Sequence, residues 1–168
     1  PLPTEQDNNI GKHLQQRGKE FGTVTQRPRR CGWFDAVATR YSARLSGADE
    51  LAVMLLDVLS ELDELRICTG YRINGKIVNQ FPGQIDDLKS AEPIYETLPG
   101  WNDDLTAVRN EADLPTNAIQ YIDRIGELLG RPVTIVSVGP DREQTIFRSG
   151  TTQPAQCPPN TQQERATV

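Results

Sequence analysis

The chain has 168 residues, enough for one domain with a hydrophobic core, and a formal net charge of −5. This acidic balance disfavours a general nucleic-acid binder, and no apolar run reaches the ~18 residues of a membrane-spanning helix. Three cysteines without metal-ligand spacing argue against a disulfide framework, and a single histidine argues against a histidine-rich metal site.

The first residues, Pro1 to Gln6, contain neither an initiating methionine nor a signal peptide, so we expect them to continue from a longer chain. A short helix is predicted over residues 6–18, where Ile10 and Leu14 lie four positions apart on one helical face.

The stretch that follows, residues 22–35, projects three arginines from a loop. Arg27, Arg29 and Arg30 flank Pro28, which disfavours a helix or a central strand at this point. A guanidinium group matches a carboxylate or a phosphate with two parallel hydrogen bonds. We therefore expect a local anion site on an acidic protein, with a solvated basic turn as the open alternative.

An amphipathic helix is predicted over residues 33–46, with Gly47 at its C-terminal cap. Trp33 is expected to anchor this helix in the core. The residues that share the helical spacing are Phe34, Val37, Ala38, Tyr41 and Leu45.

The apolar run Leu51–Leu56 predicts a strand buried on both faces, as in a parallel sheet. Asp57 follows directly, at the carboxyl end where ligands gather in such sheets. A hairpin is predicted next, with strands Arg66–Ile73 and Lys76–Phe81 joined by a type I′ turn at Asn74-Gly75.

The remaining elements follow in order. Residues 82–91 indicate a polar loop and residues 92–100 an extended segment. A helix is predicted over residues 115–129 and a buried strand over residues 132–138, which Gly139-Pro140 ends. Residues 149–168 are rich in Pro, Gln and Thr and are expected to be disordered.

Asp57 is a candidate guanine-binding residue, because one carboxylate can accept hydrogen bonds from both N1–H and the 2-amino group of that base. Ser137 and Gly139 could add a hydroxyl and a close backbone at the same end of the sheet. The structural alternatives are a helix cap or a turn for Asp57 and an ordinary strand-to-turn junction for the other two. No G-x-x-x-x-G-K-S/T motif and no nucleophile–base pair is present, so the residues alone indicate an α/β domain without a complete catalytic apparatus.

At these motifs the chain resembles the C-terminal portion of the adenylosuccinate synthetase family. The resemblance runs from the N-terminus to about Ile146, and it implies one region over residues 1–148 followed by an unrelated tail. The implied fold is α/β, the C-terminal part of a P-loop-like synthetase fold with buried strands, flanking helices and a β-hairpin. The motifs that carry it are Gly22–Asp35, Leu56–Leu59, Cys68–Tyr71, Glu92–Trp101 and Ser137–Arg142.

The resemblance implies an enzyme that joins IMP and L-aspartate with GTP and Mg²⁺ in AMP biosynthesis, and that is cytoplasmic and homodimeric at full length. It places no catalytic or metal-binding residue in this segment, so the isolated chain is expected to be inactive. Arg27 would also reach IMP, and Arg29 would link the substrates to GTP. The L-aspartate loop would comprise Thr23, Val24, Thr25, Gln26, Arg27, Pro28 and Arg29. The GTP contacts would comprise Arg29, Leu55, Leu56, Asp57, Ser137, Val138 and Gly139.

Four residues depart from the usual family pattern, namely Val24, Gln26, Leu55 and Ser60. Two other hypotheses therefore stay open. One is a free-standing relative that binds a guanine nucleotide or a dicarboxylate without catalysis, and the other is an interaction domain that keeps only the fold.

Overall fold

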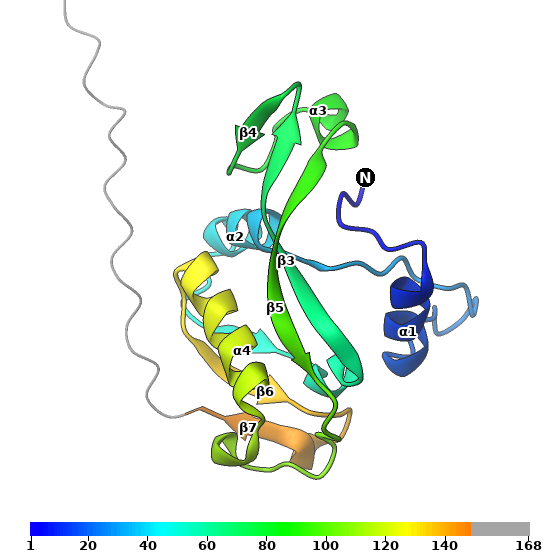
Figure 1. Cartoon of the computed structure of the whole chain (residues 1–168), viewed down its shortest axis with the longest axis vertical. Coiled ribbons are helices and arrows are strands. Elements are labelled where there is room, and N and C mark those ends of the chain that lie inside the picture. The colour runs from blue at the N-terminus through cyan, green and yellow to red at the C-terminus, as the bar shows by residue number, and fades with distance from the viewer. Residues whose placement is uncertain (149–168) are drawn as a thin grey trace, which may run out of the picture.

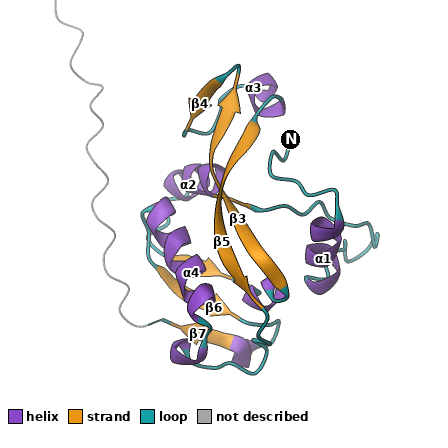
Figure 2. Cartoon of the chain, viewed as in Figure 1, coloured by secondary structure: helices purple, strands orange, loops and turns teal. Residues whose placement is uncertain are grey.

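The computed structural model describes residues 1–148, so the predicted disorder of residues 149–168 lies outside the described part of the chain. Figure 2 shows that this part contains both helices and strands, as expected for an α/β chain. The α-helices are α1 (Asn9–Arg17), α2 (Ala36–Leu45), α3 (Ile85–Lys89) and α4 (Thr116–Leu129). The strands are β1 (Phe34–Asp35), β2 (Leu51–Val53), β3 (Leu62–Ile73), β4 (Lys76–Val78), β5 (Glu92–Trp101), β6 (Val133–Ser137) and β7 (Thr145–Phe147). The short 3₁₀ helices of this part are η1 (Leu56–Leu59), η2 (Glu111–Asp113) and η3 (Arg142–Gln144).

A long antiparallel ribbon of β3 and β5 crosses the molecule from end to end (Figure 1). β4 pairs with the end of β3 in antiparallel fashion, and the short β1 pairs with its middle in parallel fashion. The predicted hairpin turn is confirmed, since φ is 50° at Asn74 and 75° at Gly75, as a type I′ turn requires. The predicted strand bounds differ, because β3 already begins at Leu62 and β4 ends at Val78 rather than at Phe81.

The second sheet has the order β2-β6-β7, with β2 and β6 parallel and β6 and β7 antiparallel. The predicted parallel pairing is thus confirmed. The predicted strand Leu51–Leu56 is too long, because β2 ends at Val53. The prediction that it is buried on both faces is also wrong, since Ala52 is exposed and Leu51 and Val53 are only partly buried. β7 has no counterpart among the predicted elements.

Helix α4 lies against both sheets and supplies much of the core, as its apolar spacing predicted. Gly130 ends it with a φ of 64°, which glycine adopts without strain. The buried residues of α4 are Ala118, Tyr121, Ile122, Ile125, Gly126 and Leu129.

The predicted helix over residues 33–46 begins three residues late. Phe34 and Asp35 form β1, and the Asp35 carboxylate accepts a 3.0 Å hydrogen bond from the Ala38 N–H and so caps α2. Trp33 is buried, as expected of an anchor, but Tyr41 and Leu45 are exposed rather than packed on the core. The predicted polar loop over residues 82–91 contains α3, which the sequence pattern did not reveal.

Among residues 1–148, no helix is long and apolar enough to cross a membrane.

Candidate functional site

The arginine loop is a narrow excursion between α1 and β1, closed at its base by backbone hydrogen bonds. The Arg29 N–H donates to Glu20 O at 2.9 Å, and the Gly22 N–H donates to Arg27 O at 2.9 Å. Gln26 at the tip has a φ of 52°, a left-handed conformation that glycine adopts more readily. Every side chain from Thr23 to Arg30 is exposed, including Val24, Thr25 and Pro28.

The three arginines of the loop differ in their partners. The Arg27 guanidinium has no hydrogen bond or ion pair with another described residue. Arg29 forms a 3.0 Å ion pair with Glu20. Arg30 donates to both carboxylate oxygens of Glu5, and these hydrogen bonds lower the pKa of that carboxyl. Arg30 therefore ties the loop to the N-terminal segment, whereas Arg27 projects its donors into solvent.

The predicted guanine residues lie on two segments that the fold brings together. The Leu55 N–H donates to Ser137 Oγ at 2.7 Å, which joins the end of β2 to the end of β6 across 82 positions of sequence. Leu55 has a φ of 57°, so the chain leaves the strand at this point. Leu56 and Asp57 consequently lie in η1 rather than in a strand, which corrects the predicted position of Asp57 at a strand end.

Asp57 has a buried carboxylate oxygen, Oδ1, that lacks a hydrogen-bond partner among the described residues. A buried polar atom without a partner is uncommon in native proteins and costs ~1–3 kcal/mol. A helix-capping role for Asp57 is not met, because no side-chain cap is formed at η1, but Asp57 does lie in a tight 3₁₀ turn.

The segment after β6 is braced by Gln144. The Val138 N–H donates to Gln144 O at 2.9 Å, and the Gln144 amide group accepts from Asp141 N–H and donates to Thr106 O. A Cβ at position 139 would lie 2.1 Å from Gln144 Oε1, so a larger residue there would displace the Gln144 amide group from these hydrogen bonds.

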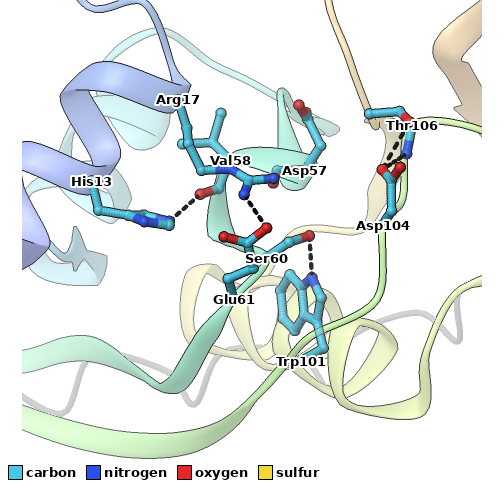
Figure 3. A network of polar contacts seen from close by, with 9 residues as sticks. All are labelled: His13, Arg17, Asp57, Val58, Ser60, Glu61, Trp101, Asp104 and Thr106. Carbon is cyan, nitrogen blue, oxygen red and sulfur yellow. Dashed lines mark hydrogen bonds and ion pairs between the residues drawn. The ribbon is translucent and has the colours of Figure 1, made fainter.

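Helix α1 contacts the turn that carries Asp57 (Figure 3). In its Nε2–H tautomer, His13 donates to the Val58 carbonyl oxygen at 3.2 Å. One turn further along, Arg17 donates to the Asp57 carbonyl oxygen at 3.3 Å and forms a 2.7 Å ion pair with Glu61. Trp101 closes the other side, donating its indole N–H to Ser60 Oγ at 3.1 Å.

The structure thus unites Leu55, Asp57 and Ser137 in one place and leaves the arginine loop apart from them. No hydrogen bond or ion pair between described residues joins loop residues 22–30 directly to residues 55–60. Both segments instead contact α1. The turn does so through His13 and Arg17, and the loop does so through Gln15, whose amide group donates to Arg29 O at 2.8 Å. His13 and Arg17 stand at positions i and i+4 of a predicted helix. Their partners lie 40 or more positions away, so no local sequence pattern predicts these contacts.

Within residues 1–148, no group of three or more His, Cys, Asp or Glu side chains could hold a metal ion.

The fold places the chain among α/β proteins with mixed sheets. A family model of adenylosuccinate synthetase matches residues 1–146. Adenylosuccinate synthetases of Pelotomaculum thermopropionicum and Clostridioides difficile are 50% and 51% identical to this chain over 147 and 148 residues, which is 88% of this chain and 34% of each relative. The fully ligated adenylosuccinate synthetase structure from Plasmodium falciparum matches with a TM-score of 0.85 and 34% identity, over 89% of this chain and 36% of that one.

The chain belongs to the adenylosuccinate synthetase family. It spans about a third of the length of the curated relatives it matches.

Proposed function

We propose that the chain is the C-terminal portion of an adenylosuccinate synthetase, a ligase that joins IMP and L-aspartate at the expense of GTP in AMP biosynthesis. In this proposal the described segment supplies the guanine-binding residues 55–57 and 137–139, and an L-aspartate loop, residues 23–29. Mg²⁺ and the acid–base groups come from the rest of the enzyme, which acts in the cytoplasm as a homodimer.

The buried, unpartnered Asp57 Oδ1 is the observation that carries the proposal. A carboxylate accepts two hydrogen bonds side by side, and guanine offers N1–H and a 2-amino group in that arrangement. A base that displaced the atoms covering Oδ1 would satisfy the orphaned oxygen and so recover the ~1–3 kcal/mol that its burial costs. Adenine lacks this donor pair, so the same carboxylate selects against it.

The exposed guanidinium groups of the loop suit a dicarboxylate. Arg27 has all its side-chain donors free of described partners, and Arg29 keeps donors beyond the one that Glu20 occupies. The ion pair with Glu20 holds the Arg29 group in place before a ligand arrives. Arg27 would contact both L-aspartate and IMP, and Arg29 would connect the loop to GTP.

Replacing Asp57 with asparagine in the full-length enzyme tests the guanine assignment. Asp57→Asn turns one acceptor oxygen into a donor that faces the donors of the base, which should cost ~1.5–3 kcal/mol of GTP binding. We expect the KM for GTP to rise roughly tenfold or more, while the KM for aspartate stays within about twofold. Steady-state kinetics with each substrate varied in turn measures both.

Asp63→Asn is the matched control, because Asp63 is an exposed carboxylate on β3. It should leave both Michaelis constants unchanged. If Asp57→Asn raised the KM values for GTP and aspartate equally, Asp57 would be a structural residue and the guanine assignment would be wrong.

A further inference from the structure

The turn that carries Asp57 begins and ends at residues with left-handed backbone conformations. Leu55 has a φ of 57° and Glu61 a φ of 68°, and neither is glycine. Such conformations cost on the order of 1–3 kcal/mol each and persist only where the surrounding structure holds them. Contacts from outside the turn must therefore hold each of its ends.

The first end of the turn is held by Ser137. Its Oγ accepts the Leu55 N–H at 2.7 Å, and Ser137 itself is fixed in β6 and fully buried. This contact aligns the start of η1 with the end of β6.

The second end of the turn is held by Arg17 and Trp101. The Glu61 N–H donates to Trp101 O at 2.8 Å, and the Glu61 carboxylate pairs with Arg17 at 2.7 Å. Arg17 also reaches the Asp57 carbonyl oxygen, so one guanidinium spans the turn from its middle to its end. Figure 3 shows Arg17 and His13 projecting together from α1 toward this turn.

An exposed Arg–Glu ion pair alone contributes only ~0–1 kcal/mol. The geometry of Arg17 differs from that case, because its side chain contacts two residues of one short turn. One is Glu61, which has a left-handed backbone, and the other is Asp57, the proposed guanine ligand. The last turn of α1 also favours a cation at this position, through the carbonyl groups of the helix end.

We propose that Arg17 is a positioning residue for Asp57, and that with His13 it holds the turn 55–61 in the strained conformation that selects guanine. This inference rests on the proposed function of Asp57 and adds a residue that does not itself touch the base. Loss of Arg17 would let the turn relax, so the Asp57 carboxylate would no longer meet both donors of guanine.

The sharpest measurement is the preference for GTP over ITP, since the hypoxanthine base of ITP keeps N1–H but lacks the 2-amino group. In the full-length enzyme, Arg17→Met should lower the ratio of kcat/KM for GTP to that for ITP by at least about fivefold. Arg17→Lys should lower it less, because an ammonium group can pair with Glu61 but does not fork to Asp57 as well. A loss of overall stability alone would reduce both rates and leave the ratio unchanged.

Lys12→Met is the matched control, because Lys12 is an exposed cation on the same helix with no side-chain partner among the described residues. It should leave the ratio unchanged. Hydrogen–deuterium exchange on the 168-residue chain gives a readout without nucleotide. There, Arg17→Met should speed amide exchange in residues 56–61 at least about threefold and Lys12→Met should not.

The outcomes separate the two proposals. If Asp57→Asn abolishes the GTP preference but Arg17→Met and Arg17→Lys both keep it, the positioning role is wrong and the guanine assignment stands. If Asp57→Asn itself keeps the GTP preference, the guanine assignment is wrong, and the proposed effect of Arg17 on that preference is wrong as well. Unchanged exchange at residues 56–61 in Arg17→Met would overturn the positioning role whatever the kinetics.

Discussion

At the scale of single residues, the arginine loop presents three side chains of one type in three different environments. Arg27 has no partner among the described residues, Arg29 is paired with Glu20, and Arg30 is paired with Glu5. Sequence alone treats the three as one cluster. The structure distinguishes an exposed guanidinium without a described partner, one paired with Glu20 and one that fastens the loop to the N-terminal segment.

Arg27→Lys and Arg29→Lys in the full-length enzyme should each lose at least about tenfold in kcat/KM for aspartate, roughly 1.4 kcal/mol. An ammonium group cannot supply the paired donors that a carboxylate accepts, so lysine keeps the charge but not the fork. Steady-state kinetics with aspartate varied checks this, and thermal melts should show both variants folded.

Arg30→Lys serves as the control within the same loop, since its partner Glu5 belongs to the protein. Its aspartate kinetics should stay within about threefold of the parent. Near-normal kinetics in both Arg27→Lys and Arg29→Lys would make the loop a solvated turn.

At the scale of elements, sequence patterns predicted the helices and turns that depend on residues close together in the chain. The Asn74-Gly75 hairpin and helix α4 follow from turn residues and from apolar spacing within a few positions. The ribbon of β3 and β5 was predicted only as shorter separate pieces, because its full length depends on pairing between strands about 30 positions apart.

The candidate site was harder to predict than the elements. The apolar run 51–56 looks like one strand, but a hydrogen bond to Ser137 and a left-handed Leu55 convert its end into η1. That bond joins residues 82 positions apart, so no local pattern contains it. The same holds for Arg17, whose partners in the turn lie far along the chain.

The close approach of β3 and β5 gives a prediction at this scale. A Cβ at position 100 would lie 1.7 Å from the Leu62 carbonyl oxygen, which is backbone and cannot rotate away. Gly100→Ala should therefore lower the free energy of unfolding by at least about 2 kcal/mol. Urea denaturation of the 168-residue chain measures this.

Gly83→Ala is the matched control for Gly100→Ala, because a Cβ at position 83 would meet nothing within 4 Å and the φ of Gly83 is not left-handed. Its effect should stay within about 0.5 kcal/mol. Equal effects of the two substitutions would mean that the ribbon separates freely at Gly100.

At the scale of the whole molecule, buried thiol and phenol groups should make the folded state less stable at alkaline pH. Burial raises the pKa of the Cys68 thiol to about 12, with the Asp35 carboxylate adding to the effect. Burial likewise raises the pKa of Tyr95 to about 12, and that of Tyr71 further. In the unfolded chain these groups ionise near their ordinary values, about 8.5 for cysteine and about 10 for tyrosine.

The unfolded state therefore loses protons that the folded state keeps, and stability falls as the pH rises. The stability should be intact below about pH 8.5 and should be lost progressively toward about pH 12. Cys68 alone contributes a slope of up to about 1.4 kcal/mol per pH unit in the lower part of this window. Urea denaturation at several pH values in reductant should show a shallower decline for Cys68→Ala, and an unchanged slope would contradict the role of this thiol.

The length of the chain gives the last prediction. Ligation needs a positioned acid, a base and a metal ion, and the family resemblance places none of these groups in this segment. The 168-residue chain covers about a third of its curated relatives, and the proposal assigns it binding segments only. We therefore expect no synthetase turnover from the purified chain in an assay that detects adenylosuccinate, with the full-length Clostridioides difficile relative as the positive control. Calorimetric titration with GDP in the same preparation separates a segment that still binds guanine from one that keeps only the fold. Product formation that requires GTP, IMP and aspartate together would show that this chain carries the chemistry itself.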